Sequence, residues 1–129
     1  MGLYMAENDW TVEFHDEFDK EFNQLAEVVQ NEILTLALLV KREGPQLGRP
    51  HADTLNASKY SNMKELRTKV NNGVWRIAFA FDPNRRAVML IAADKAGKSE
   101  KRFYKQLIAT ADARFAQWLK EIEKNGSHT

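Results

Sequence analysis

The sequence predicts an α+β fold in which a helical hairpin packs on a twisted, mainly antiparallel sheet of about four strands, followed by a long C-terminal helix. Two observations support this prediction. Strand-like segments joined by short turns fill residues 63–93, and apolar residues at helical spacing precede and follow that region. A chain of 129 residues has the size of a single domain, and we expect its core over about residues 10–122, with loose termini.

Three adjacent antiparallel strands are predicted between residues 63 and 93. Asn72-Gly73 indicates a hairpin between the first two, because a type I′ turn requires positive φ at both central residues. Asp82-Pro83-Asn84 indicates the next turn, because Pro presets φ and the Asp side chain can bond back to the backbone. The third strand, residues 88–93, is apolar on both sides, so we expect it to be central or covered.

Large and small side chains alternate along the middle strand. The large residues are Trp75, Ile77, Phe79 and Phe81, and the residues between them are Arg76, Ala78 and Ala80. We expect the large side chains to face the helices, which leaves the other face as an open surface on which a ligand can lie. The face of Arg67 on the preceding strand stays undetermined, since a one-residue slip in register inverts it.

Helix and strand signals flank these strands. Residues 10–14 alternate as a short edge strand, and Asp16 can cap a first helix. A second helical run ends at Gly44-Pro45, so residues 16–44 form a helical hairpin or one bent helix. Ser99 is a good N-cap for the last helix, which Asn125-Gly126 ends. That helix carries an apolar stripe of Phe103, Leu107, Ala111, Phe115, Trp118 and Ile122.

Residues 44–62 are rich in Gly, Pro, Ser and Asn and predict a long connecting loop. Loops of this length are often functional. Four side chains in the loop are candidate ligand contacts: Arg49, His51, Lys59 and Tyr60.

Composition excludes several classes of protein. The chain has no cysteine, so disulfides and thiolate metal sites are excluded. The longest apolar run, Leu36–Val40, is too short to span a bilayer, and the N-terminus lacks a signal pattern. We therefore expect a soluble, cytoplasmic protein that does not interact with a membrane.

Three common catalytic motifs also fail. Gly97-Lys98-Ser99 resembles the end of a phosphate-binding loop, but the required first glycine is replaced by Ala92. The three histidines, His15, His51 and His128, lack the paired spacing of a zinc site. No G-x-S-x-G motif is present, which argues against serine catalysis. We expect no metal and no cofactor.

Charge is distributed unevenly along the chain. The first 32 residues contain nine acidic and one basic residue, whereas the remaining residues contain nine acidic and eighteen basic ones. This division predicts an acidic helical surface and a separate basic surface able to bind phosphate. The basic cluster comprises Arg67, Arg76, Lys95, Lys98, Lys101, Arg102 and Lys105, with Tyr104 among them.

Such a cluster has the groups needed to cleave RNA. Attack of a 2′-hydroxyl on its phosphodiester needs a base, cations for the charge of the transition state and an acid for the 5′-oxygen. Lysines crowded by other cations have lowered pKa values and can serve as acid or base, while arginines stabilise the developing charge. Tyr104 either helps in this chemistry or is a core residue of the apolar stripe.

The order of motifs resembles a known family. M-K-E-L-R at residues 63–67, W-R-I at 75–77 and D-K-A-G-K-S-E-K-R-F-Y at 94–104 resemble the RelE/HigB-like toxins of bacterial type II toxin-antitoxin modules, in the phage-derived Gp49-like group. The resemblance extends over roughly residues 10–120 and implies a RelE-like α+β fold. It also implies a metal-independent endoribonuclease that cleaves mRNA on the ribosome, inhibits translation and arrests growth.

Site residues follow from the resemblance by position. It implies a catalytic set of Arg67, Arg76, Lys95, Lys98 and Tyr104, and RNA contacts at Lys59, Lys101, Arg102 and Lys105. Which lysine is the base, and whether Asp94 contributes, stays open. The implied partner is a cognate antitoxin, often of helix-turn-helix type, whose acidic, amphipathic segment covers apolar and basic surfaces.

Two other functions remain open from the sequence. Members of the same superfamily that resemble ParE inhibit DNA gyrase by binding it, and a nucleic-acid-binding module without catalysis would also explain the basic residues. The free toxin is expected to be a monomer or an oligomer of undetermined size.

Overall fold

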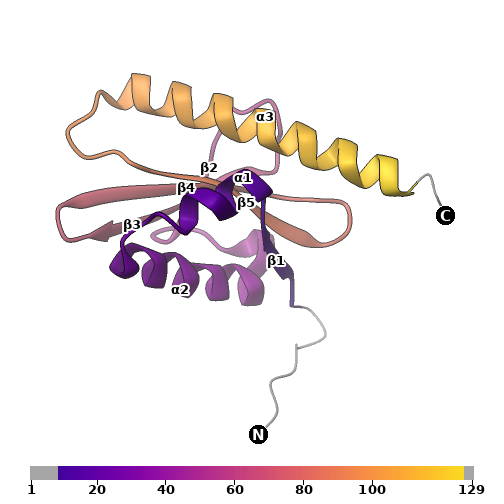
Figure 1. Ribbon diagram of the computed structural model, residues 1–129, viewed down its shortest axis with the longest axis horizontal. Coiled ribbons are helices and arrows are strands. Elements are labelled where there is room, and N and C mark those ends of the chain that lie inside the picture. The colour runs from indigo at the N-terminus through magenta and orange to yellow at the C-terminus, as the bar shows by residue number, and fades with distance from the viewer. Residues whose placement is uncertain (1–8, 127–129) are drawn as a thin grey trace, which may run out of the picture.

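The computed structural model describes residues 9–126 as three layers, with a central sheet between the helices α1 and α2 on one side and α3 on the other (Figure 1). The elements are β1 (Thr11–Phe14), α1 (Asp16–Phe22), α2 (Glu27–Glu43), η1 (Gly44–Gln46), β2 (Ala52–Thr54), β3 (Met63–Val70), β4 (Gly73–Phe81), β5 (Arg86–Asp94) and α3 (Glu100–Gly126). The expectations of loose termini and of an N-terminus without a signal pattern concern mainly residues 1–8 and 127–129, which lie outside the described residues.

The sheet has five strands in the order β1-β5-β4-β3-β2, and all neighbours are antiparallel except the parallel pair β1 and β5. The α+β fold is therefore confirmed, as is the edge position of the first strand. The expected number of strands was one too few, because β2 lies inside the segment predicted to be a loop. A strand of three residues is too short to show alternation, and its pairing with β3 defines it instead.

Both predicted turns are present, but the first differs in detail. Val70 pairs with Gly73, so the central residues are Asn71 and Asn72, and only Asn71 has positive φ (54°). The type I′ assignment at Asn72-Gly73 was wrong, because Gly73 already lies in β4. Glycine is needed at this position for a different reason, since a Cβ there would come within 2.7 Å of the Trp75 indole nitrogen.

At the second turn, the side chain of Asp82 bonds back to the backbone as expected. It accepts the N–H groups of Asn84 and Arg86 at 2.8 and 2.9 Å. This closes the connection between β4 and β5.

The large face of β4 packs against α1 and α2, as the alternation predicted. Ile77 and Phe79 are fully buried there, in a core shared with Phe18 of α1 and Ile33 and Val40 of α2. Burial of such side chains contributes about 1.5–3 kcal/mol each relative to exposure, so this layer is the main support of the sheet.

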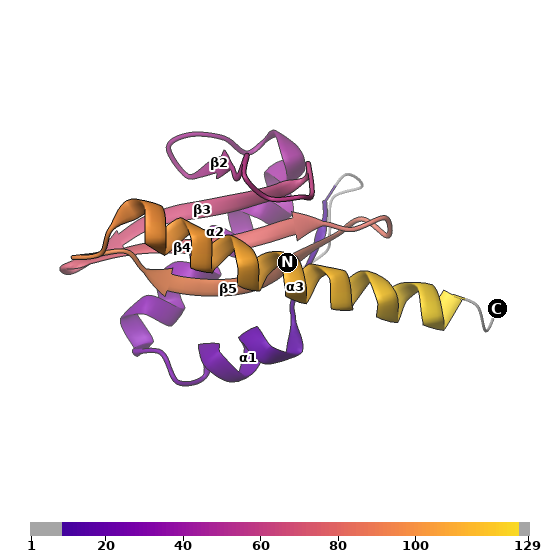
Figure 2. The same ribbon diagram turned by 90° about the horizontal axis from the view of Figure 1, so that it is seen from above.

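The opposite face is also covered, which corrects the expectation of an open surface. Ala78 and Ala80 are fully buried under α3, against Phe103, Leu107 and Phe115 of the predicted apolar stripe. The small alanine side chains leave room for the large side chains of the helix, so the small face of β4 receives α3. Figure 2 shows α3 running along the sheet and extending beyond it.

Two features explain how α3 reaches this position. Ser99 precedes the helix, and its side chain accepts the N–H of Arg102 at 3.5 Å, in agreement with the predicted cap. A register shift in β5 places both Leu90 and Ile91 on the α3 side. Of the expected apolar third strand, residues 88–90 are buried and residues 91–93 are partly buried. Among the described helices, none combines the length and apolar character needed to cross a membrane.

Gly44 ends α2 with φ 58° and ψ −143°, a conformation open almost only to glycine, and a Cβ there would overlap the Trp10 indole ring. We expect Gly44→Ala to lower the free energy of unfolding by about 3 kcal/mol through strain and overpacking, as measured by urea denaturation. Gly97→Ala is the control, because φ is +70° there but a Cβ meets nothing within 4 Å. Equal losses in the two variants would contradict the packing role of Gly44.

Candidate functional site

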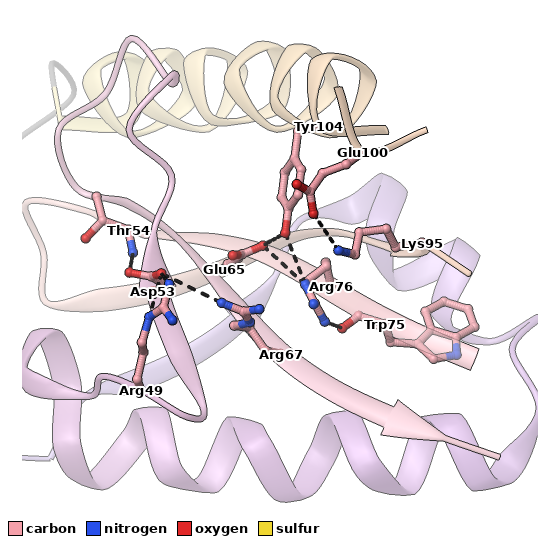
Figure 3. A network of polar contacts seen from close by, with 10 residues as sticks. All are labelled: Arg49, Asp53, Thr54, Glu65, Arg67, Trp75, Arg76, Lys95, Glu100 and Tyr104. Atoms are coloured by element: carbon pink, nitrogen blue, oxygen red, sulfur yellow. Dashed lines mark hydrogen bonds and ion pairs between the residues drawn. The ribbon is translucent and has the colours of Figure 1, made fainter. Parts of the chain in front are cut away.

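Strand register places two cross-strand pairs of charged residues next to each other on the α3 face of the sheet. Arg67 of β3 is the direct partner of Arg76 of β4, and Asp53 of β2 is the direct partner of Glu65 of β3. Directly paired residues point to the same face, and residues two apart on a strand share it. The four side chains therefore lie together, as Figure 3 shows.

Like charges face each other across the strands, and opposite charges meet along the diagonals. Arg67 Nη1 lies 3.8 Å from Asp53 Oδ2, and Arg76 Nε lies 3.7 Å from Glu65 Oε1. Like charges directly opposite each other destabilise a sheet, so the diagonal ion pairs offset part of the repulsion. We call these four residues the charge lattice.

Tyr104 of α3 contacts the two buried residues of the charge lattice, Glu65 and Arg76, and we call these three residues the triad. Its hydroxyl donates to Glu65 Oε1 at 2.8 Å and accepts from Arg76 Nε at 3.1 Å. Arg76 also donates to the Trp75 carbonyl at 3.0 Å. Arg76 and Glu65 are each only 5% exposed, so these contacts fix both side chains.

Burial changes the acid–base properties of this triad. It raises the pKa of the Glu65 carboxyl, while the Tyr104 hydrogen bond and the nearby Arg76 charge oppose the rise. Burial and the hydrogen bond to Glu65 also raise the pKa of the Tyr104 phenol. Tyr104 is therefore protonated at neutral pH and acts as a hydrogen-bond donor.

Lys95 joins the site from the end of β5. Its ammonium group bonds to Glu100 Oε1 at 2.8 Å and lies 5.8 Å from the centroid of the Tyr104 ring. The Lys95 hydrogen bond lowers the pKa of Glu100, and the charges of Arg76 and Arg67 act in the same direction. The sequence predicted cationic neighbours for this lysine, and the structure adds an acidic partner, Glu100.

Arg49 forms the outer edge of the site. Its Nε and Nη2 atoms donate to Asp53 Oδ2 at 3.0 and 2.7 Å. The hydrogen bonds from Arg49 are the main reason that the pKa of Asp53 is lowered. Arg49 and Arg67 therefore share one carboxylate, which leaves a local excess of positive charge on this side.

Of the predicted catalytic residues, the structure brings together Arg67, Arg76, Lys95 and Tyr104. Lys98 meets this group through its backbone, whose N–H donates to the Lys95 carbonyl at 3.2 Å, while the charge of its side chain acts on Asp94. Asp94 accepts the N–H groups of Val74 and Ala96, both at 2.9 Å, so its carboxylate is engaged in holding the backbone.

The predicted RNA-contact residues are exposed and lie outside the charge lattice. Lys101, Arg102 and Lys105 project from the first turns of α3, and Lys59 lies over the Tyr60 ring at 5.7 Å from its centroid. Their roles stay predictions.

Sequence reasoning missed the acidic residues Asp53 and Glu65. One signal for Glu65 was present, since it precedes Arg67 by two residues in the strand and must share its face. The signal for Asp53 was absent, because the strand that positions it was not predicted.

Similarity to known proteins agrees with this geometry. Residues 20–116 match the family described as phage-derived protein Gp49-like. A protein of Mycobacterium tuberculosis named as a candidate toxin, HigB3, is 49% identical over 81 residues, which are 63% of this chain and 68% of that protein. A second candidate toxin of the same organism, HigB2, is 44% identical over 86 residues, which are 66% of this chain and 42% of that protein.

Solved structures show the same fold at low sequence identity. The Escherichia coli toxin RelE, a mutant in the free state, matches with a TM-score of 0.53 at 14% identity, over 78% of this chain and 95% of that one. The RelE of a RelE–RelB complex from Pyrococcus horikoshii matches with a TM-score of 0.52 at 12% identity, over 70% of this chain and 99% of that one.

The structural similarities assign the fold of this chain, and the sequence similarities assign its family. The fold is that of the RelE-type toxins, as the resemblance predicted. The chain belongs to the Gp49-like family, within the RelE/HigB type of toxins from toxin-antitoxin modules.

Tyr104→Phe tests the triad. The change leaves Glu65 and Arg76 without the hydroxyl between them, and we expect the free energy of unfolding in urea to fall by about 1–3 kcal/mol. Tyr60→Phe is the matched control, since within residues 9–126 the Tyr60 hydroxyl makes no hydrogen bond. Similar losses in both variants would show that the Tyr104 hydroxyl contributes nothing.

Glu65→Gln tests the buried carboxyl through pH dependence. Because the folded-state pKa of Glu65 is raised, its contribution to stability is fully present below the ordinary carboxyl pKa of 4.5 and is lost as pH rises through the raised value. We therefore expect the stability of the wild type relative to Glu65→Gln to fall as pH rises across that range. A pH-independent difference would contradict this, and the exposed Glu123→Gln provides the control.

Proposed function

We propose that this chain is the toxin of a toxin-antitoxin module and an endoribonuclease that cleaves mRNA on the translating ribosome. The family and fold support the toxin class. The directly paired arginines Arg67 and Arg76 carry the proposal of catalysis, because an anion between them would relieve the repulsion that the lattice leaves uncompensated.

The pair has free capacity for such an anion. Within residues 9–126, the side-chain hydrogen bonds of Arg76 engage Nε and Nη1, and none engages Nη2, which leaves that atom to donate to an anion. Arg67 has a partly exposed side chain, and its one ion pair among the described residues is the 3.8 Å contact with Asp53. Arginine binds two phosphate oxygens at once, so the two guanidinium groups suit a phosphodiester whose charge increases in the transition state.

Neighbouring groups supply the proton transfers. Attack of the 2′-oxygen on phosphorus breaks the bond to the 5′-oxygen and leaves a 2′,3′-cyclic phosphate and a 5′-hydroxyl. Lys95 carries an ammonium proton that the departing 5′-oxygen can accept. The Tyr104 hydroxyl connects the site to the Glu65 carboxylate and offers a route by which the 2′-hydroxyl proton can leave. The reaction requires no metal.

Variants of the arginine pair test this proposal. We expect Arg67→Ala and Arg76→Ala to relieve growth arrest and to lower mRNA cleavage by about 10²-fold, because each removes charge stabilisation in the transition state. Primer extension on mRNA from expressing cells measures the cuts. Arg42→Ala removes an exposed arginine of α2 and is expected to leave cleavage unchanged.

Folding and competing functions are controlled separately. Because Arg76 is buried, Arg76→Lys keeps a positive charge and tests the loss of the planar guanidinium in a chain expected to fold. Intact mRNA together with double-strand DNA breaks would indicate gyrase inhibition and would overturn the proposal. Full toxicity of both alanine variants would show that the site lies elsewhere.

Lys98→Ala tests the exposed cations that precede and begin α3. We expect it to reduce growth arrest by weakening RNA binding. The KM of the variant is expected to rise, while its kcat stays closer to the wild-type value than the kcat of the two arginine-to-alanine variants does. Its exposed position makes a folding defect unexpected. An unchanged KM would place RNA contacts away from this end of α3.

A further inference from the structure

The charge lattice contains two carboxylates, those of Glu65 and Asp53, and both are fixed by their surroundings. Glu65 is only 5% exposed and accepts the Tyr104 hydroxyl at 2.8 Å. Asp53 accepts two N–H groups of the Arg49 side chain at 3.0 and 2.7 Å and the backbone N–H of Thr54 at 2.8 Å. An anion that displaced either carboxylate would break these contacts, which is costly in free energy.

A third carboxylate of the site, that of Glu100, is held by one contact. It accepts from the Lys95 ammonium group at 2.8 Å, and Lys95 is its only side-chain partner among residues 9–126. The Glu100 side chain is 74% exposed at the start of α3. Exposed ion pairs are weak, because water solvates both charges and a mobile side chain loses freedom when it is fixed. Glu100 is therefore the carboxylate of this site that an anion displaces most easily.

Lys95 is the more firmly placed partner of this ion pair. Its backbone N–H donates to the Val74 carbonyl at 2.6 Å, which fixes it at the end of β5. Its side chain is 19% exposed, and its ammonium group lies 5.8 Å from the centroid of the Tyr104 ring. Figure 3 shows the ion pair next to Tyr104, whose hydroxyl bonds to Arg76. When the ion pair separates, Lys95 stays in the site, whereas the exposed Glu100 can rotate into water.

The cations that attract Glu100 are those proposed above to act on phosphate. The hydrogen bond and the charge of Lys95 lower the pKa of Glu100, and the charges of Arg76 and Arg67 lower it further. We call Arg67 and Arg76 the arginine pair. A phosphodiester bound by the arginine pair would repel the Glu100 carboxylate and attract the Lys95 ammonium group. RNA binding and the ion pair between Lys95 and Glu100 therefore oppose each other.

We propose that Glu100 competes with RNA for Lys95, so that a phosphodiester bound by the arginine pair displaces Glu100 and takes its place on the ammonium group. The inference rests on the proposed function, since it requires that the arginine pair binds RNA. Glu100 thereby sets the affinity of the site for RNA, and Lys95 becomes free to contact phosphate only when an anion has entered the site.

Binding of a 2′-O-methyl RNA oligonucleotide that cannot be cleaved, measured by fluorescence anisotropy with the full chain, tests the proposal. We expect Glu100→Gln to lower the Kd by about threefold to tenfold, because the variant keeps the size of the side chain but loses the charge that holds Lys95. Glu123→Gln is the matched control, since it removes the same charge from an exposed position near the other end of α3. The control is expected to leave the Kd unchanged.

A second background separates competition from a general effect of charge. Lys95→Met is expected to weaken RNA binding, and in this background Glu100→Gln is expected to change the Kd by less than about twofold, because no ammonium group is left to release. An equal decrease in Kd in both backgrounds would show that Glu100 acts only by long-range repulsion of RNA, which would contradict the proposal.

The same measurements distinguish this inference from the proposed function. An unchanged Kd for Glu100→Gln would refute the competition alone. Absence of RNA binding by the wild type and by all variants would refute both proposals. Tighter binding by Glu100→Gln that depends on Lys95, in a chain that cleaves no mRNA, would support the competition and refute only the nuclease function.

Discussion

The register between β3 and β4 is the constraint on which the site depends. It places Arg67 directly opposite Arg76, on a face where Glu65 and Asp53 compensate the charges only along the diagonals. A shift of one residue would turn Arg67 to the α2 side and separate the pair. The short turn at Asn71-Asn72 and the buried apolar residues of both strands fix this register, so fold stability and site geometry have the same origin.

The two helical layers cover opposite faces of the sheet and have different structural roles. α1 and α2 bury the large face of the sheet, and an apolar groove lies between β1 and the outward side of α2. α3 buries the alanines of β4 and brings Tyr104 between Glu65 and Arg76. The proposed phosphate chemistry therefore lies on the face of the sheet opposite to the one that α1 and α2 bury.

The sequence was sufficient for the parts of the fold that depend on periodicity and turn chemistry. It predicted three of the central features: the alternation in β4, the apolar stripe of α3 and the turn at Asp82. It failed where tertiary contacts decide, as at the three-residue strand β2 and at the small face of β4, which α3 covers. The cations were recognised, but Glu65 was not, because its proximity to Arg76 follows from a register that a single strand does not reveal.

The central claim is that Arg67 and Arg76 bind one phosphate between them. Side-chain NMR of the arginine Nε–H groups, recorded while a 2′-O-methyl RNA oligonucleotide that cannot be cleaved is added, tests this most directly. If one phosphate lies between the two guanidinium groups, the signals of Arg67 and Arg76 shift together, with one dissociation constant, while the signal of Arg42 on α2 stays unchanged. Shifts confined to other arginines, with Arg67 and Arg76 unaffected, would contradict it.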